Sequence, residues 1–253
     1  MSKILIDISF VGTEYNGYQI QPNAPTVQGQ LNVAAKKLFG FECDIVGCSR
    51  TDSGVHANQF CATISDKGSE SLNTNIPIEK IASALNFYLP EDISVKSSKS
   101  VDDSFHARYD VKSKEYLYRI LNTRERNPFL NNRAWHYPKH IDDTSLENMR
   151  LAAKMLEGTH DFSSYMAANS SVSTTVRTVY STDVYRENDT IIFKVSADGF
   201  LYNMVRIFTG TLIAVAEGRI APSEIASITD AKDRTRAGVT APPQGLYLNK
   251  VNY

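Results

Sequence analysis

The sequence contains no long apolar run. A helix that crosses a bilayer needs roughly 18 to 20 consecutive apolar residues, and no stretch of the chain approaches that length. Near the amino terminus an acidic residue, Asp7, comes too early for the apolar region of a secretory signal peptide. We therefore expect a cytoplasmic protein that does not enter a membrane.

Residues that bind metals or form disulfides are scarce as well. The three cysteines, Cys43, Cys48 and Cys61, cannot all pair, and their spacing fits no common zinc site. The five histidines are scattered without the spacing of a ligand set. The sequence therefore predicts reduced thiols, as is usual in the cytoplasm, and no metal site.

The chain also lacks a large excess of either positive or negative charge. The formal net charge is −1, which does not by itself indicate a nucleic-acid binder. The two halves nevertheless differ: residues 1–104 hold 8 basic and 12 acidic side chains, whereas residues 105–253 hold 19 and 16. Because a polyanion is bound by local clusters of lysine and arginine, a phosphate-binding surface should draw mainly on the second half.

Two kinds of hydrophobic periodicity alternate along the 253 residues. A period of two predicts strands, and apolar residues three and four apart predict amphipathic helices. Strands are expected over residues 4–10, 43–46, 55–64, 113–122, 175–187 and 190–197, with short ones from 93 and 135 and a last one after 245. Helices are expected over residues 27–39, capped by Thr26, from 77 to before 90, over 144–157, ended by Gly158, and over 200–217. Such a mixture indicates the α+β class.

One stretch concentrates reactive side chains at a turn. Asp52 and Gly54 lie between two expected strands, and both residue types favour turns. A carboxylate is therefore expected at a tight bend, with Arg50 two residues before it and His56 four residues after it. A capped hairpin turn would explain an isolated Asp-Ser-Gly, but it does not need this density of reactive groups.

The residues of this stretch match a known pattern. Residues 47–57 have the form Gly-x-x-Arg-Thr-Asp-x-Gly-Val-His-Ala, which resembles the active-site signature of the TruA family of tRNA pseudouridine synthases. Segments 10–19, 105–109, 161–165, 230–238 and 245–248 resemble the same family. The chain departs from it at Tyr18, where tryptophan is usual, and at Ser53, where alanine is more frequent. Neither departure removes a functional group.

The resemblance implies a fold and an activity. The fold would be α+β, with two similar halves, residues 1–104 and 105–253, whose antiparallel sheets meet along a central cleft. The activity would be isomerisation of uridine to pseudouridine at positions 38, 39 and 40 of the tRNA anticodon stem-loop, carried out by a homodimer. Since no atom is gained or lost overall, no cofactor is required.

The resemblance also implies roles for four residues. Asp52 would be the catalytic carboxylate, acting either as a nucleophile or as a base. Arg50 would contact the phosphate backbone and help to hold the flipped nucleotide, and Tyr116 would stack on the uracil. Arg206, among apolar neighbours, would be costly to bury alone and would pair with Asp52, keeping that carboxylate ionised.

Two other functions stay open. A non-catalytic RNA-binding protein would use Tyr116 and Tyr118 as a stacking platform and the basic loop 123–133 for phosphates, but would not need an Asp52–Arg206 pair. An aspartic protease would use Asp52 in its Asp-Ser-Gly triplet. That chemistry needs two carboxylates sharing a proton, and since the chain has only one such triplet, only a symmetric dimer could supply the second.

Overall fold

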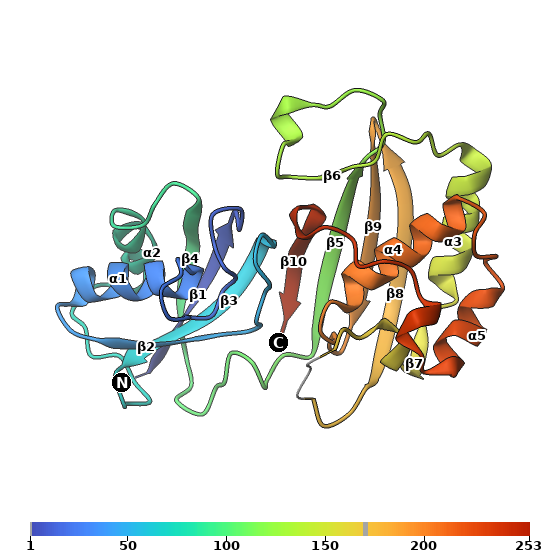
Figure 1. The fold of residues 1–253 in the computed structure, drawn as a ribbon. Coiled ribbons are helices and arrows are strands. Elements are labelled where there is room, and N and C mark those ends of the chain that lie inside the picture. Colours follow the sequence, from blue (N-terminus) through green and yellow to red (C-terminus); the bar gives the residue numbers. More distant parts are fainter. Residues whose placement is uncertain (1, 169–171) are drawn as a thin grey trace. The chain divides into compact units, whose positions relative to one another are not determined.

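The computed structural model describes residues 2–168 and 172–253 of the chain (Figure 1). They form two compact units: Met1–Lys112 together with Tyr247–Tyr253, and Ser113–Leu246. Residues 105–112 and Tyr247–Tyr253 thus group with the first unit, whereas the division expected from the sequence placed them in the second. None of the helices in the described ranges is long and apolar enough to cross a membrane.

The first unit is built on a mostly antiparallel sheet. Its strand order is β4 (Ile93–Val101), β1 (Lys3–Phe10), β3 (His56–Asp66) and β10 (Leu246–Asn252), and β2 (Cys43–Gly47) also pairs with β3. The pairing of β10 with β3 is parallel, with Tyr247 opposite His56. Two helices, α1 (Val27–Phe39) and α2 (Ile78–Asn86), contact each other and pack on β2 and β4.

Local sequence signals explain α1. The hydroxyl of Thr26 accepts a hydrogen bond from the N–H of Gly29 at 3.2 Å, which satisfies one of the unpaired donors of the first turn. Gly40 ends the helix in the left-handed conformation, with φ of 82°. The buried face consists of Val27, Leu31, Ala34 and Ala35. The helix predicted over residues 27–39 is confirmed.

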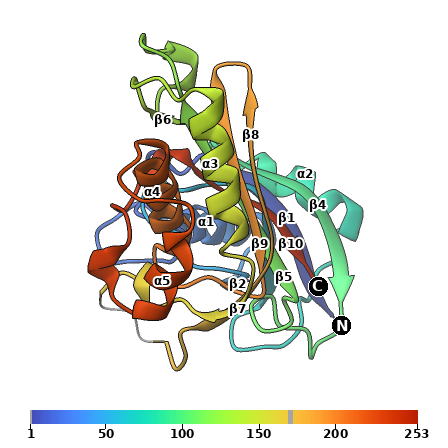
Figure 2. The ribbon, with the colours of Figure 1, turned by 90° about the vertical axis from the view of Figure 1, so that its right-hand side faces the viewer.

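The second unit has an antiparallel sheet with the order β5 (Ser113–Leu121), β9 (Thr190–Ala197), β8 (Val176–Glu187) and β7 (Gly158–Asp161). A short strand, β6 (Trp135–His136), adds to β5 in parallel. Helix α3 (Asp143–Lys154) packs on β8 and on α4 (Met204–Ala216), while α5 (Glu224–Ala231) contacts β7 (Figure 2). The described part of this unit also contains the 3-10 turns η1 (Pro128–Leu130), η2 (Ser163–Tyr165), η3 (Arg234–Arg236) and η4 (Pro243–Gly245). The α+β class with mostly antiparallel sheet is confirmed.

Several predicted boundaries in this unit were wrong. Helix α3 begins at Asp143, because the Asp142 side chain caps it, and it ends at Lys154 instead of Glu157, while Gly158 starts β7. Helix α4 begins at Met204, four residues later than predicted, because Asn203 adopts a left-handed backbone with φ of 61°. Helix α5 and strand β7 were not predicted.

Candidate active site

The turn that carries Asp52 connects β2 to β3 in the first unit. The N–H of Val55 donates to the carbonyl oxygen of Asp52 at 3.2 Å, and Gly54 has φ of 76°. Only glycine adopts such a positive φ without steric cost, so the sequence favours this turn. The Asp52 side chain is half-buried and that of Arg50 is exposed. The expected bend with a carboxylate at its apex is present.

A loop from the amino-terminal part of the unit, residues 12–18, lies against this turn. The carbonyl oxygen of Tyr15 accepts hydrogen bonds from the N–H of Gly54 at 3.3 Å and from the hydroxyl of Ser53 at 3.2 Å. The Tyr15 hydroxyl in turn donates to the carboxylate of Asp92 at 2.6 Å. These bonds hold Ser53 and Gly54, the two residues that follow Asp52, against the 12–18 loop.

Two glycines permit the close approach of this loop. A Cβ atom on Gly12 would lie 1.9 Å from the carbonyl oxygen of Val55, and one on Gly17 would lie 2.4 Å from that of Thr51. Both distances are far below van der Waals contact. The same carbonyl of Thr51 accepts a hydrogen bond from the N–H of Tyr18 at 3.2 Å. The turn is therefore supported on both sides by backbone of the 12–18 loop.

His56 also serves this support. Its side chain is fully buried, and its Nδ1 accepts a hydrogen bond from the N–H of Gly12 at 2.9 Å. A ring nitrogen that accepts carries no proton, so in the neutral ring the proton is on Nε2. The ring also packs on Tyr247, with centroids 4.7 Å apart. The histidine of the signature therefore anchors the loop to β3.

Tyr18, which replaces the usual tryptophan, lies inside the core of the first unit. Its ring is 3% exposed and stacks on Phe60 with centroids 4.2 Å apart. A Cβ on Gly47 would come within 2.4 Å of the ring, so the site is closely packed. Burial raises the pKa of the Tyr18 phenol. Across the described residues, its hydroxyl oxygen finds no hydrogen-bond partner. Tyr18 is therefore a core residue whose backbone N–H also binds the Thr51 carbonyl beside the turn.

A groove of about 260 Å³ opens beside Arg50, and all of its lining residues belong to the first unit. Its polar lining includes Gln19, Gln28, Ser49, Arg50, His106, Arg108 and Tyr109. Two guanidinium groups in one groove favour an anion, and guanidinium binds phosphate well because its planar fork offers two parallel donors.

The far wall of this groove is a compact turn, residues 106–110. Nδ1 of His106 accepts from the N–H groups of Arg108 at 3.1 Å and Tyr109 at 3.2 Å. The imidazole stacks on the ring of Tyr109, with centroids 4.2 Å apart, and the Arg108 guanidinium lies 5.8 Å from that ring. Tyr109 remains 74% exposed. The turn presents a cation and an aromatic face together. The family resemblance implied that segment 105–109 links the two halves and lines the cleft, but it gave no role to Arg108 or Tyr109.

The remaining two predicted site residues belong to the second unit. Tyr116 lies on β5 opposite Val195 of β9, and its ring meets Phe200 edge-on at 5.0 Å. This contact fixes the plane of the ring. Its neighbour two positions on, Tyr118, is fully buried and donates its hydroxyl to the carbonyl oxygen of Pro242. Burial raises the pKa of Tyr118, and the positive charge of Arg206 opposes that shift in part.

Arg206 lies in the first turn of α4. Its Nη1 donates to the side-chain oxygen of Asn203 at 2.6 Å, and its Nε donates to the carbonyl oxygen of Ala241 at 2.7 Å. The first turn of α4 contains no acidic residue. A cation beside the positive end of a helix dipole is favourable only when an anion is close. The arrangement therefore holds a guanidinium rigidly where it can attract a carboxylate or a phosphate.

Asp52 and Arg50 thus belong to one unit, and Tyr116 and Arg206 to the other. The ion pair expected between Asp52 and Arg206 stays a prediction. Over residues 2–168 and 172–253, no group of three or more histidine, cysteine, aspartate or glutamate side chains is placed to hold a metal ion.

Comparison with known proteins assigns the chain to a protein family. A family model described as tRNA pseudouridine synthase matches residues 8–110 and 152–253. The "tRNA pseudouridine synthase A" of Thermoanaerobacter sp. (strain X514) is 48% identical over 255 residues, and those of Ruminiclostridium cellulolyticum and Acetivibrio thermocellus are each 43% identical. All of these alignments cover 100% of both chains. The chain belongs to the tRNA pseudouridine synthase family.

Proposed function

We propose that this chain isomerises uridine to pseudouridine at positions 38, 39 and 40 of the tRNA anticodon stem-loop, as a cytoplasmic homodimer, with Asp52 as its catalytic carboxylate. The observation that carries the proposal is the half-buried carboxylate at the apex of a turn supported on both sides. The family supplies the reaction class. Membership of this family does not favour the two alternatives, a non-catalytic RNA-binding protein and an aspartic protease.

The reaction needs a carboxylate held in position more than it needs added reagents. The bond between N1 of uracil and the ribose breaks, the uracil turns, and C5 bonds to the same ribose carbon. The proton on C5 is released and N1 gains one, so atoms balance without an oxidant or reductant. Asp52 acts on this path either as the nucleophile or as the base. A turn that cannot shift lowers the entropic cost of reaching the reactive geometry.

Arg206 supports an ionised carboxylate. Because Asn203 and Ala241 already fix the guanidinium, little side-chain entropy is lost when it pairs with an anion. A guanidinium next to Asp52 stabilises the charged form of that side chain. The carboxylate would then be ready to act at neutral pH.

The substrate nucleotide must leave its stack before it can react. Flipping costs a few kcal/mol, and stacking on an aromatic ring returns about 1 to 3 kcal/mol per base. Tyr116 supplies this ring for the uracil. Arg50 and Arg108 bind phosphates of the adjacent backbone in the groove of the first unit, which is lined by both guanidinium groups.

The test uses a tRNA transcript labelled with tritium at C5 of uracil and no added cofactor. Pseudouridine formation must release this tritium, so release by the wild type and none by Asp52→Asn would support the proposal, provided that the variant still binds tRNA. Transcripts in which only one of the three positions carries uridine assign the sites. Binding without release from either protein would contradict the proposed activity.

A further inference from the structure

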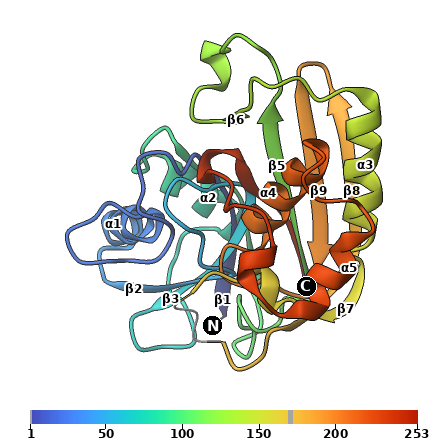
Figure 3. The same cartoon turned by 45° about the vertical axis from the view of Figure 1, so that its right-hand side comes forward.

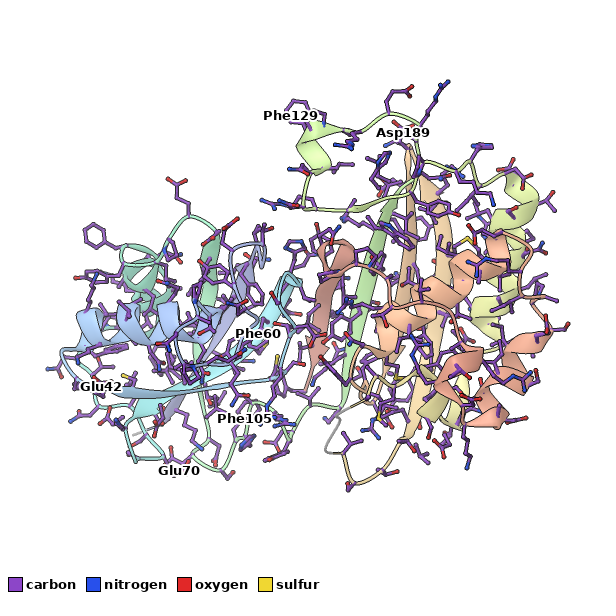
Figure 4. All side chains as sticks on the ribbon, in the orientation of Figure 1. Glu42, Phe60, Glu70, Phe105, Phe129 and Asp189 are labelled. Atoms are coloured by element: carbon purple, nitrogen blue, oxygen red, sulfur yellow. The ribbon has the colours of Figure 1, made fainter. Side chains whose placement is uncertain are left out.

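Phe129 is the most exposed of the large apolar side chains described in the structure, at 93%. It lies in η1, within the loop 123–134 that connects β5 to β6 in the second unit. This loop extends past the end of β5, and Phe129 lies at its tip (Figures 3 and 4). A single exposed apolar side chain does not by itself require a partner, so the surroundings of the ring decide what it can bind.

The backbone around Phe129 is ordered before any partner binds. The side-chain oxygen of Asn127 accepts from the N–H of Phe129 at 3.0 Å, and the carbonyl of Asn127 accepts from Leu130 at 3.0 Å. Pro128 occupies the first position of the turn, where its fixed φ is favourable. The N–H of Arg133 donates to the carbonyl of Leu130 at 2.9 Å, which forms a second turn directly after η1. The backbone that carries the ring therefore has little entropy left to lose on binding.

The charges of the loop indicate the chemistry of the partner. Arg124 and Arg126, which precede Phe129 in the sequence, are exposed, and Arg133, which follows it, is half-buried. Glu125 is the one acidic residue in the loop sequence. A projecting aromatic ring between arginines fits bases and phosphates, because a base stacks on the ring while the guanidinium groups meet the backbone.

The loop lies outside the part of the chain that the family model matches. That match covers residues 8–110 and 152–253, so residues 111–151 are not included. Asp52 and Arg206 lie within the matched segments. The unmatched range also contains Tyr116, and the alignments with the curated relatives include the loop, because they cover the whole chain.

We propose that Phe129 stacks on an unpaired or helix-terminal base of the tRNA substrate, other than the uridine that reacts, while Arg124, Arg126 and Arg133 bind the flanking phosphates. The proposal rests on the proposed function, because that function makes tRNA the substrate. Phe129 is then a substrate-binding residue and takes no part in the chemical step.

The test compares Phe129→Ala with Phe87→Ala. Phe87 is a matched control, since it is 82% exposed and has no lysine or arginine within six positions in the sequence. We expect Phe129→Ala to raise the Kd for an unmodified tRNA transcript by roughly 5- to 100-fold, the equivalent of one lost stacking contact. Phe87→Ala should leave the Kd unchanged. Phe129→Trp should bind like the wild type, and Phe129→Leu, which keeps an apolar side chain without a ring, should bind like the alanine variant.

Three further measurements separate stacking from other roles. The single-turnover rate of tritium release with saturating enzyme should be the same for wild type and Phe129→Ala. Arg126→Gln should reduce the slope of log Kd against log salt by about one. If Phe129→Ala and Phe87→Ala bind tRNA equally well, or if Phe129→Ala instead changes the oligomeric state in light scattering, the proposal is wrong. In the second case the ring contacts another copy of the chain.

The failure of this proposal differs from the failure of the proposed function. A wild type that binds tRNA but releases no tritium contradicts the isomerase activity, while the difference in Kd between the two alanine variants still tests stacking. A wild type that releases tritium with equal Kd values for both variants contradicts only the role of Phe129.

Discussion

The hydroxyl of Ser53 donates a hydrogen bond to the carbonyl oxygen of Tyr15 at 3.2 Å, directly after the catalytic candidate Asp52. The N–H of Gly54 donates to the same oxygen. An alanine at position 53 would leave that carbonyl with one of its two donors. We expect Ser53→Ala to lower the free energy of unfolding by about 0.5 to 1.5 kcal/mol and kcat by less than about threefold, because the backbone bond still holds the turn. Urea unfolding and tritium release would measure the two effects, and a loss of activity as complete as that of Asp52→Asn would contradict this view of Ser53.

Gly17 should tolerate no side chain. Its φ is +86°, and a Cβ would lie 2.4 Å from the carbonyl oxygen of Thr51. Gly17→Ala adds backbone strain and a clash, so we expect a loss of about 2 to 4 kcal/mol in stability together with lower activity, since the displaced carbonyl belongs to the residue before Asp52. Gly68 is a suitable control, because its φ is +73° and a Cβ there would have nothing within 4 Å. Gly68→Ala should cost only about 1 kcal/mol, and equal losses for the two variants in chemical denaturation would show that the contact with Thr51 is unimportant.

The hydroxyl of Tyr18 is expected to be dispensable for stability. It is buried and, among the residues that the structure describes, has no hydrogen-bond partner, which costs free energy in the folded state. Tyr18→Phe keeps the stacking on Phe60 and should leave the protein as stable as the wild type or up to about 1 kcal/mol more stable. Tyr118→Phe provides the contrast, because Tyr118 donates to the carbonyl of Pro242; it should lose about 1 to 2 kcal/mol. Thermal unfolding that ranks the two variants in the opposite order would refute the argument.

The parts of the fold that could be predicted are those with local signals. Thr26 and Gly40 fix both ends of α1 through caps that involve only neighbouring residues, and the helix was placed correctly. The start of α4 was missed because Asn203 adopts a left-handed conformation that its sequence neighbours do not require. The parallel addition of β10 to β3 pairs His56 with Tyr247, which are far apart in the sequence, and strand periodicity carries no information about such a partner.

The same limit applies to the candidate site. The turn at Asp52 could be predicted, because turn residues between two strands are a local pattern. The contacts of Ser53 with Tyr15 and of Gly17 with Thr51 could not be predicted, because they depend on how two segments distant in the sequence pack together. For His106, Arg108 and Tyr109, the resemblance implied only a segment that links the two halves and lines the cleft, and their stacked arrangement could not be predicted. A basic and an aromatic residue side by side in a polar stretch were the available signal.

Asp161 should make the second unit sensitive to acid. Hydrogen bonds from the side chains of Ser163 and Thr175, aided by Lys232, hold the pKa of this carboxyl well below its usual range. A carboxylate whose pKa is lower in the folded state stabilises the fold above its unfolded pKa, near 4, and this stabilisation is lost as the pH falls through the folded value. We expect unfolding measured from pH 7 to pH 2 to show a shallower acid-induced decrease in stability for Asp161→Asn than for the wild type, with a difference that develops below about pH 4. Parallel curves for the two proteins would mean that Asp161 does not titrate differently on folding.

Asn203 should control activity through Arg206. Its side chain accepts from Nη1 of Arg206, and its backbone has φ of 61°, which glycine adopts without strain. Asn203→Gly therefore removes this acceptor without changing the backbone, while the bond from Arg206 to the carbonyl of Ala241 remains. If Arg206 pairs with Asp52, a loosened guanidinium stabilises the carboxylate less, so the carboxylate takes up a proton at higher pH. We expect kcat to fall on the order of 10-fold and the acidic limb of the kcat–pH profile to move to higher pH, while the Kd for tRNA changes little. A variant with a higher Kd for tRNA and an unmoved acidic limb would instead place Arg206 on a phosphate, because loss of a phosphate contact weakens binding without altering the ionisation of Asp52.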